Sequence, residues 1–432
     1  MKKPFYLLIG LFFALSLSAQ TKPSTQWFED ARFGMFIHFG PYSVLANGEW
    51  IMNTRPITGP DYKRLQDLFN PQAFNAKEWV KIAKDAGMKY ITLTSRHHDG
   101  FSNWDTKQSD WNIMHTPYGK DLIKQLADEC HKEGIKLVLY YSLLDWMRSD
   151  YQYETGRTGQ KAGRTEKSDW DSYIRFMKAQ LTELLTNYGP IAGIWFDGHW
   201  DQTAHENRTS HDTTVDWHYP EIYGLIHRLQ PECLIANNHH LPPFAGEDYQ
   251  IFEKDIPGDN KTGLSGQEIS RLPLETCETL NDNWGFSITD DHFKSPKDVI
   301  HLLVRTVGTG ANLLLNVGPM PNGKIQPEFV ECLREVGGWM NKYGYTLYKT
   351  QQGFVSPQTW GACTCIGKTH YIHILDKNIS TLSLNIPGLQ SVEGINFEKP
   401  VIWKKDKKTG NVVFTFTGAL DEIDSIIEVK VK

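Results

Sequence analysis

Short apolar runs alternate along most of this chain with longer stretches of helical periodicity. The first four apolar runs, each the length of a buried strand, are residues 33–40, 89–95, 135–142 and 191–196. The helical stretches between them are residues 74–87, 121–133 and 170–188. Glycines and a Gly-Pro pair lie where these stretches end, as expected of helix stops. The pattern predicts parallel strands joined by helical crossovers.

The alternation continues to residue 317. Four further strands are predicted at residues 233–236, 249–253, 274–279 and 312–317, with helices at 219–230, 296–307 and 327–343. Eight strands, most of them separated by helix-length segments, predict a (β/α)8-type barrel over residues 20–346. An open doubly wound sheet is the alternative. It is disfavoured because no Gly-x-Gly-x-x-Gly turn follows the first strand.

The pattern changes after Gly353. Residues 370–374, 382–386 and 411–416 alternate between apolar and polar side chains and are separated by Gly, Asn and Lys turns. This pattern is typical of antiparallel strands. We therefore predict a small C-terminal β-sandwich over residues 347–432, in which we find no catalytic pattern.

The N-terminus has the pattern of a secretory signal. Two lysines precede an apolar run at residues 5–17, and small residues follow it, so residues 1–19 are predicted to be a cleaved signal peptide. A transmembrane anchor is the alternative, but the run is shorter than the ~20 apolar residues that a span needs. We expect a secreted or periplasmic mature chain with no membrane anchor.

Composition narrows the possible ligands. The net charge is −6 and no basic stripe is present, which argues against nucleic acid and against an anionic membrane surface as partners. Aromatic residues make up 12% of the chain, with 14 Trp and 18 Tyr, which fits a cleft that binds sugars. The six cysteines show no disulfide-framework spacing, so mostly buried free thiols are expected.

One carboxylate stands at the end of a predicted strand. Asp197 follows the apolar run 191–196 and precedes a glycine. In parallel α/β folds the carboxyl ends of the strands form the ligand-binding crevice. A helix-capping Asp is the alternative interpretation. The neighbouring aromatic rings of Trp195, Phe196 and Trp200 favour a sugar site, because the apolar face of a pyranose stacks on such rings.

Other predicted strands also end in polar side chains. They contribute His38, His97 with His98, Tyr140 or Tyr141, residues 237–240, and Glu247 or Glu253. If the barrel forms, these groups converge on one pocket although more than two hundred residues separate them.

Two chemistries compete for such a pocket. Zinc could be bound by His38, His97, His98, His239 and Asp197. Paired-histidine motifs of the usual spacing are absent near these strand ends, and adjacent histidines on a strand point to opposite faces. Glycoside hydrolysis by two carboxylates uses more of the polar groups. We therefore expect an enzyme with no metal and no cofactor.

Five motifs resemble those of the α-L-fucosidases of glycoside hydrolase family 29, from about Trp27 to Tyr343. They are Trp27-Phe followed by Gly34-Met-Phe-Ile-His38-Phe-Gly-x-Tyr42-Ser, Gly48-Glu-Trp50, His97-His-Asp-Gly100-Phe, Tyr140-Tyr-Ser-x3-Trp146, and Trp195-Phe-Asp-Gly198. Pro273-Leu-Glu-Thr-Cys277, followed by Trp284-Gly-Phe, is similar to a degraded form of the family's Trp-Glu-x-Cys signature.

The resemblance implies roles for individual residues. Asp197 would be the nucleophile of a retaining double displacement. The fucose-binding shell would be His38, Glu49, Trp50, His97, His98 and Tyr141, with Trp195 and Trp284 as an apolar wall for the C6 methyl group. Family members place the acid/base differently. Glu253 matches the position used in one subgroup and Glu247 that used in another, and we favour Glu253.

The sequence therefore predicts a retaining exo-α-L-fucosidase that acts on fucosylated oligosaccharides or glycoconjugates. Nearby donors are expected to favour the conjugate base of Asp197. A catalytically silent glycan-binding protein and a metal-dependent hydrolase are the alternatives. Residues 237–240 read Asn-Asn-His-His where many members have Asn-Asp-Arg-Trp, so the linkage and the aglycone stay open, as does the oligomeric state.

Overall fold

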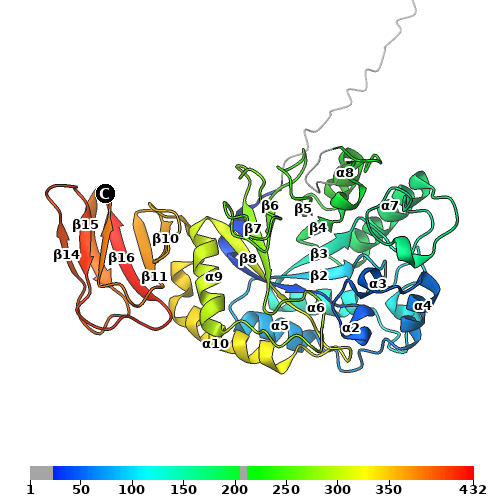
Figure 1. The fold of residues 1–432 in the computed structure, drawn as a ribbon, viewed down its shortest axis with the longest axis horizontal. Helices are drawn as coiled ribbons and strands as arrows, with labels where there is room; N and C mark the ends of the chain where they lie inside the picture. Colours follow the sequence, from blue (N-terminus) through cyan, green and yellow to red (C-terminus); the bar gives the residue numbers. More distant parts are fainter. Residues whose placement is uncertain (1–22, 205–211) are drawn as a thin grey trace, which may run out of the picture.

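Eight parallel strands form one sheet in the larger part of the molecule (Figure 1). The computed structural model describes residues 23–204 and 212–432, so the predicted signal peptide lies outside the described residues. The strands are β1 (Phe33–Ile37), β2 (Tyr90–Arg96), β3 (Lys136–Ser142), β4 (Gly193–Asp197), β5 (Leu234–Asn238), β6 (Gln250–Glu253), β7 (Leu274–Thr279) and β8 (Ala311–Val317). Each coincides, within a few residues at its ends, with a strand predicted from the sequence.

The strand order is β5-β4-β3-β2-β1-β8-β7-β6, so β5 and β6 are the two edges that meet when the sheet curls. At the entry to β6 the amide of Asp248 donates to the carbonyl of Ile235 at 2.7 Å, and the amide of Ile235 donates to the Asp248 carboxylate at 2.9 Å. These bonds link the two edges at one end. The sheet is a nearly closed barrel, which confirms the (β/α)8 prediction, and the open-sheet alternative is wrong.

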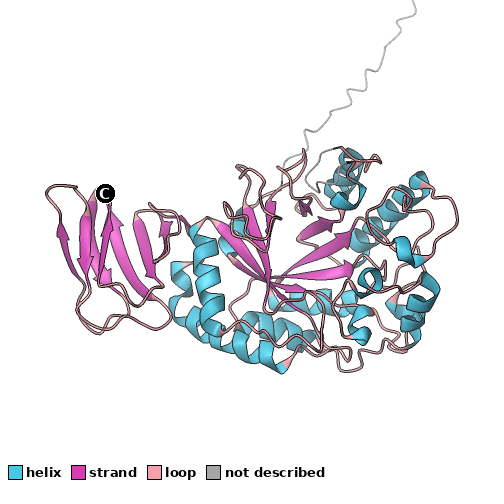
Figure 2. Cartoon of the chain, in the orientation of Figure 1, coloured by secondary structure: helices cyan, strands magenta, loops and turns pink. Residues whose placement is uncertain are grey.

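Helices surround the barrel, as the cyan ribbons around the magenta strands show (Figure 2). The long ones are α5 (Ala76–Asp85), α6 (Leu122–Glu133), α7 (Trp170–Asn187), α8 (Tyr219–Leu229), α9 (Pro296–Gly308) and α10 (Pro327–Tyr343). Short helices α1 (Gln26–Ala31), α2 (Tyr42–Leu45), α3 (Ile51–Thr54) and α4 (Gly59–Lys63) come before α5. Side-chain hydrogen bonds fix some helix starts, as at α9, where Ser295 and Asp298 form a capping box.

Two apolar layers hold the barrel together. The inner layer, inside the sheet, includes Phe36, Tyr140, Trp195, Ala236 and Leu314. The outer layer, between the sheet and the helices, takes the neighbouring positions on the same strands, among them Met35, Tyr141, Phe196, Ile235 and Leu315. Because successive side chains on a strand point to opposite faces, β1 to β4 and β8 are buried on both sides and are mostly apolar rather than alternating.

The C-terminal part consists of two antiparallel sheets. One has the order β13-β16-β11-β10-β9 and the other β12-β15-β14. Their strands are β9 (Gln351–Gln352), β10 (Gly361–Ile366), β11 (Thr369–Ile374), β12 (Thr381–Leu384), β13 (Leu389–Gly394), β14 (Ile402–Lys405), β15 (Val412–Thr415) and β16 (Ser425–Val431). Buried side chains of both sheets, such as Ile372 and Phe414, form one core between them. The predicted β-sandwich is confirmed.

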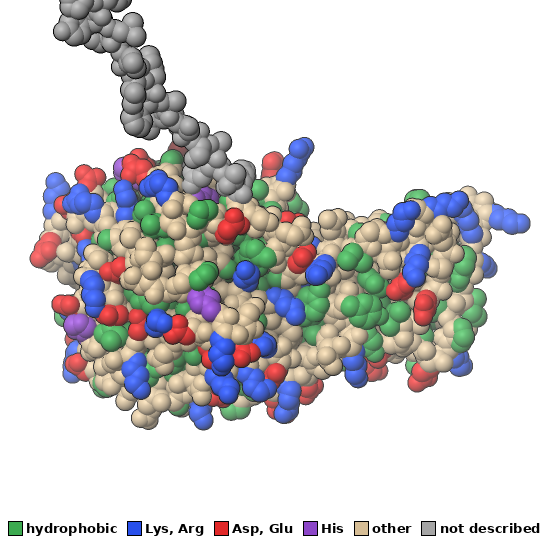
Figure 3. Space-filling model, turned by 180° about the vertical axis from the view of Figure 1, so that it is seen from behind, with side chains coloured by type: hydrophobic (Ala, Val, Ile, Leu, Met, Phe, Trp, Pro, Cys, Tyr) green, Lys and Arg blue, Asp and Glu red, His purple; other side chains and the backbone are tan. Residues whose placement is uncertain are grey.

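All six cysteines are free thiols, and five of them are buried. Acidic and basic side chains are interspersed over the face shown in Figure 3. Within residues 23–204 and 212–432, no helix has both the length and the apolar character needed to cross a lipid bilayer.

Candidate active site

A small cavity, part of it open to solvent, lies at the carboxyl ends of the barrel strands. Eight of the residues predicted from sequence line it: His38, Trp50, His97, His98, Trp195, Asp197, Glu253 and Trp284. The predicted convergence of distant strand ends is therefore present in the structure.

Asp197 is the last residue of β4 and is 8% exposed. The Tyr140 hydroxyl donates to its Oδ2 at 2.9 Å, and the Trp200 indole donates to its Oδ1 at 3.2 Å. Gly198 follows with a φ of 105°, and a Cβ at that position would meet Leu144 at 3.1 Å. A glycine is needed there so that the chain can turn sharply and leave the carboxylate facing the cavity.

Burial dominates the ionisation of Asp197. Burial makes the largest contribution and the negative charge of Glu253 the next, and together they raise the pKa of Asp197 to about 7. The hydrogen bonds from Tyr140 and Trp200 oppose the shift. The expectation that nearby donors favour the conjugate base is wrong in its net direction. The donors are present, but desolvation outweighs them.

Glu253 ends β6 and faces the same cavity. The amide nitrogen of Asn238 donates to Glu253 Oε2 at 2.8 Å and makes a longer contact of 3.4 Å with Asp197 Oδ1. Both carboxylates are therefore within reach of one nitrogen atom. This arrangement fits the shorter carboxyl separation, about 5 to 5.5 Å, that accompanies retention of configuration in glycosidases.

Glu247 lies elsewhere. Its buried carboxylate accepts hydrogen bonds from the Tyr223 hydroxyl at 2.9 Å and from the Phe244 amide at 3.0 Å, and it contacts the His239 ring at 3.1 Å. These three partners hold the Glu247 carboxylate at a place outside the cavity lining. Of the two glutamates considered as acid/base, the structure brings only Glu253 together with Asp197.

Tyr141 was expected in the sugar-binding shell, and this expectation is wrong. Its hydroxyl donates to Gln180 Oε1 at 2.9 Å on α7, outside the barrel. The adjacent Tyr140 faces inward instead, because neighbouring side chains on a strand point to opposite faces. Glu49 is buried beside the cavity rather than in its lining, and it accepts the Gly285 amide at 2.7 Å next to Trp284.

His97 and His98 both line the cavity, with ring centroids 4.1 Å apart. The expectation that they face opposite ways is wrong. β2 ends at Arg96, so the two histidines lie in the following loop, where side chains do not alternate as they do on a strand. Burial lowers the pKa of both imidazoles well below the usual value, and that of His38 to about 3. The three rings are therefore neutral at physiological pH.

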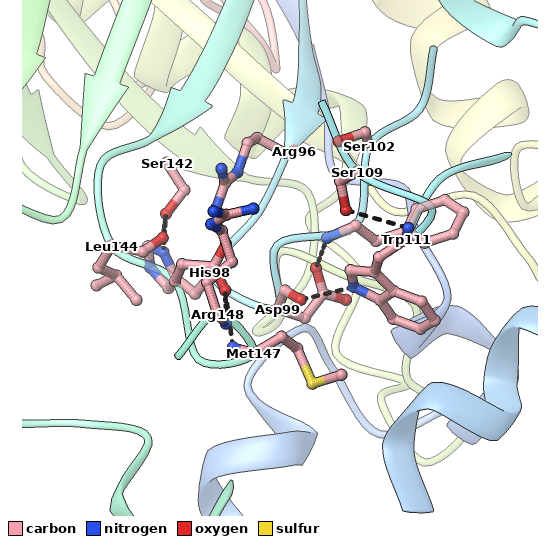
Figure 4. A network of polar contacts seen from close by, with 12 residues as sticks. Arg96, His98, Asp99, Ser102, Ser109, Trp111, Ser142, Leu144, Met147 and Arg148 are labelled. Carbon is pink, nitrogen blue, oxygen red and sulfur yellow. Dashed lines mark hydrogen bonds and ion pairs between the residues drawn. The ribbon is translucent and has the colours of Figure 1, made fainter. Parts of the chain in front are cut away.

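Hydrogen bonds behind two of these rings fix their tautomers. The Asn316 amide nitrogen donates to the Trp284 carbonyl, which leaves its Oδ1 to accept from His38 Nδ1 at 2.7 Å. Ser142 donates to the Leu144 carbonyl at 2.7 Å, so its oxygen accepts from His98 Nδ1 at 2.8 Å (Figure 4). Both rings thus keep Nε2 as an acceptor.

Aromatic rings form the walls of the cavity. Trp195 stacks on Tyr140 with centroids 5.4 Å apart, and its indole nitrogen donates to Glu275 at 2.9 Å. Trp50 stacks on Trp200 at 5.6 Å. Trp284 lies 5.1 Å from the His38 ring. Fixed rings around a small cavity suit the apolar faces of a sugar.

The lining also contains residues that the sequence indicated only as members of a group or as neighbours of Asp197, namely Tyr140, Trp200, Asn238 and His240. Phe36, Leu264 and Cys277 line the cavity as well and were not among the candidates. Phe36 precedes His38 by two positions and so shares its face of β1, which is a signal that could have identified it. Leu264 lies in the long β6–β7 connection, where no sequence pattern indicates its place.

The zinc alternative is not supported by side-chain positions. His239 lies against Glu247, away from His38, His97 and His98. In the described part of the chain, the one group of three potential ligands close enough to share an ion is Asp282, Asp290 and His292. This group is outside the cavity lining.

The chain was compared with known families and structures. A family model described as alpha-L-fucosidase matches residues 14–345. The chain is 26% identical over 447 residues to an alpha-L-fucosidase of Branchiostoma floridae, covering 94% of this chain and 92% of the relative.

Two solved structures are similar over nearly the whole chain. Alpha-L-fucosidase isoenzyme 1 from Paenibacillus thiaminolyticus has a TM-score of 0.81 and 33% identity, covering 94% of this chain and 98% of its own. An alpha-L-fucosidase GH29 from Bacteroides thetaiotaomicron, trapped as a covalent intermediate with 2-fluoro-fucosyl fluoride, has a TM-score of 0.78 and 25% identity, covering 94% and 95%.

Proposed function

The chain belongs to the α-L-fucosidase family, glycoside hydrolase family 29, and from this premise we propose that it is a retaining exo-α-L-fucosidase. The observation that carries the proposal is the pair Asp197 and Glu253, held by one amide group in a cavity lined by neutral imidazoles and indoles. A small cavity at the end of a barrel, unlike a long open groove, suits a single terminal sugar. We therefore assign release of terminal L-fucose to this site.

The first chemical step uses both carboxyl groups. The Asp197 carboxylate attacks the anomeric carbon while the Glu253 carboxyl gives its proton to the departing glycosidic oxygen. The bond to the aglycone breaks with inversion, and a β-linked fucosyl ester forms on Asp197. Because burial raises the pKa of Asp197 to about 7, the nucleophile must lose its proton before this step.

The second step reverses these roles. Glu253, now a carboxylate, removes a proton from water, and the water oxygen attacks the anomeric carbon from the face that the aglycone left. The ester bond to Asp197 breaks and α-L-fucose is released. Two inversions give net retention of configuration.

The remaining lining residues hold the sugar. His38 and His98 each present Nε2 as an acceptor for a hydroxyl group, because Asn316 and Ser142 fix the opposite ring nitrogen as a donor. Trp195 and Trp284 offer an apolar wall for the methyl group at C6. One missing hydroxyl gives only modest discrimination, so the wall favours fucose over a hydroxymethyl sugar by about 10- to 100-fold.

The proposal extends to substrate and location. The substrates are fucosylated oligosaccharides or glycoconjugates with fucose at a terminus. The N-terminal pattern supports removal of residues 1–19 and a secreted or periplasmic mature enzyme. N-terminal sequencing of the protein purified from its source tests this point. An intact Met1 would contradict it.

Removal of the nucleophile tests the function. Asp197→Gly is expected to abolish release of 4-nitrophenol from 4-nitrophenyl α-L-fucoside, and added azide is expected to restore turnover. The product would be β-fucosyl azide, because the small anion attacks once from the face that Asp197 occupied. Unchanged activity in this variant, or a wild-type protein that binds fucose without hydrolysing any fucoside, would reject the proposal.

A further inference from the structure

The barrel has a seam between β5 and β6. Within the described residues the eight-stranded sheet runs from β5 to β6 through its other strands, and these two edges share no ladder. Asp197 lies on β4, on one side of the seam, and Glu253 lies on β6, on the other. The bonds of Asp248 close the seam only at the opposite ends of the strands. Backbone pairing therefore does not fix the separation of the two carboxyl groups.

Asn238 spans the seam at the carboxyl ends of the strands. It is the last residue of β5 and stands in register with Asp197 on β4. Its side-chain nitrogen donates to Glu253 Oε2 at 2.8 Å and contacts Asp197 Oδ1 at 3.4 Å. A primary amide carries two N–H groups, so one nitrogen can serve both carboxylates.

The orientation of this amide follows from its neighbours. Carboxylate oxygens on both sides require the nitrogen to face them, which turns Oδ1 away from both. The side chain is 3% exposed and lines the cavity, so the amide group is buried beside both carboxyl groups.

We propose that Asn238 sets the spacing of Asp197 and Glu253 across the seam. The proposal rests on the fucosidase function above. Asn238 is a positioning residue: its amide nitrogen holds the Glu253 carboxyl group at the distance from Asp197 at which the Glu253 proton can reach the departing glycosidic oxygen.

The neighbouring residue provides a matched control. Asn237 is also buried on β5, but its nitrogen donates to Tyr223 at 3.2 Å on the outer side of the strand. Asn237→Ala and Asn238→Ala therefore remove the same side chain from adjacent positions. Only the second touches the carboxyl groups.

The experiment compares leaving groups. Asn238→Ala is expected to lower kcat/KM for 4-nitrophenyl α-L-fucoside by only about 10-fold, because this leaving group departs without help from an acid. For fucosides with poor leaving groups, which need Glu253 in place, the loss is expected to reach about 100-fold or more. Asn237→Ala is expected to lower kcat/KM for both kinds of substrate by the same small factor.

One result would overturn the inference: a loss in Asn238→Ala that is equal for good and poor leaving groups. If Asn238→Ala does not fold, the same comparison is made with Asn238→Leu, which keeps the volume and lacks the amide. An inactive wild type would instead reject the fucosidase function itself, so the two failures are distinguishable.

Discussion

The Tyr140 hydroxyl donates a hydrogen bond of 2.9 Å to Oδ2 of Asp197. The next side chain on the same strand, Tyr141, sends its hydroxyl to Gln180 on the outer face of the barrel. Two adjacent tyrosines therefore have different consequences for the ionisation of the nucleophile.

Tyr140→Phe removes one of the donors that oppose the effect of burial on Asp197. We expect kcat/KM to fall by about 10- to 100-fold, as for loss of a hydrogen bond to a charged group. The acidic limb of the kcat/KM profile should move to higher pH, because the Asp197 carboxylate becomes harder to form. Steady-state kinetics across pH measure both effects.

Tyr141→Phe is the control for this variant. It leaves Gln180 with one fewer donor and is expected to lower the unfolding temperature while keeping the shape of the pH profile. A shift of the acidic limb in Tyr141→Phe, or an unmoved limb in Tyr140→Phe, would contradict the assignment.

Asp197→Asn is expected to stabilise the protein above neutral pH. Burial raises the pKa of Asp197 from 3.8 to about 7, so the folded protein binds this proton more tightly than the unfolded chain. The stability due to this group is present below about pH 4 and is lost as pH rises through about 7. At about pH 8 the variant should exceed the wild type by on the order of 2 kcal/mol.

Denaturant unfolding of both proteins between about pH 4 and 8 measures the difference. The gap is expected to shrink steadily on acidification. In parallel, wild-type kcat/KM should fall below about pH 7 by up to tenfold per unit, since the free enzyme needs the ionised nucleophile. A gap that widens on acidification would show that the Asp197 carboxylate is favoured, and not penalised, by folding.

Glu253→Ala and Glu247→Ala separate the two candidates for the acid/base. Glu253 faces Asp197 across the cavity, so its loss should cost about 100-fold or more on fucosides with poor leaving groups and much less on the 4-nitrophenyl substrate. Glu247 accepts from Tyr223 and Phe244 in the protein interior. Glu247→Ala should lower the unfolding temperature without changing the leaving-group dependence. If Glu247→Ala instead showed the larger loss on poor leaving groups and Glu253→Ala did not, Glu247 would be the acid/base.

Ser142→Ala tests the tautomer of His98. Without the hydroxyl, Nδ1 loses its acceptor and Nε2, which is 3.5 Å from Asp197 Oδ2, becomes free to carry the proton. We expect the acidic limb of kcat/KM to move to lower pH, because the nucleophile gains a donor. KM should rise several-fold, because a sugar hydroxyl loses its acceptor.

Ser95→Ala is matched to this variant. Ser95 is also buried at a strand end and donates to the Tyr140 carbonyl at 2.6 Å, but its hydroxyl does not contact His98. It should lower stability and leave the acidic limb in place. Equal shifts in the two variants would mean that any buried serine at this end of the barrel has the effect.

The fold could be predicted from the sequence because its strands are buried on both faces. Most of the eight appear as short apolar runs between helical stretches, and the rule for crossovers leaves few topologies. Because the strands are buried on both faces, the sequence did not show which side chains face the inside of the barrel. Tyr140 and Tyr141 are both buried aromatics on β3, so no alternation of polar and apolar residues distinguished the cavity face from the outer face.

Part of the site depends on relationships between strands that single-sequence patterns do not contain. Asp197 and the histidines could be selected because each follows its own strand. Asn238 was predicted only as one of residues 237–240, and its contact with Glu253 became recognisable only when β6 was placed across the seam from β5. The net ionisation of Asp197 depends on how much solvent the whole cavity excludes, whereas the sequence suggested only the local donors.

The central claim is that Asp197 bonds covalently to the anomeric carbon of fucose. The most direct measurement is to treat the enzyme with 2-fluoro-fucosyl fluoride, which slows release of the intermediate, and to map the labelled peptide by mass spectrometry. The account predicts one 2-fluorofucosyl group per chain, on the peptide that contains Asp197 and on that side chain. A label on a different carboxylate, or complete absence of label from an enzyme that turns over fucosides, would contradict it.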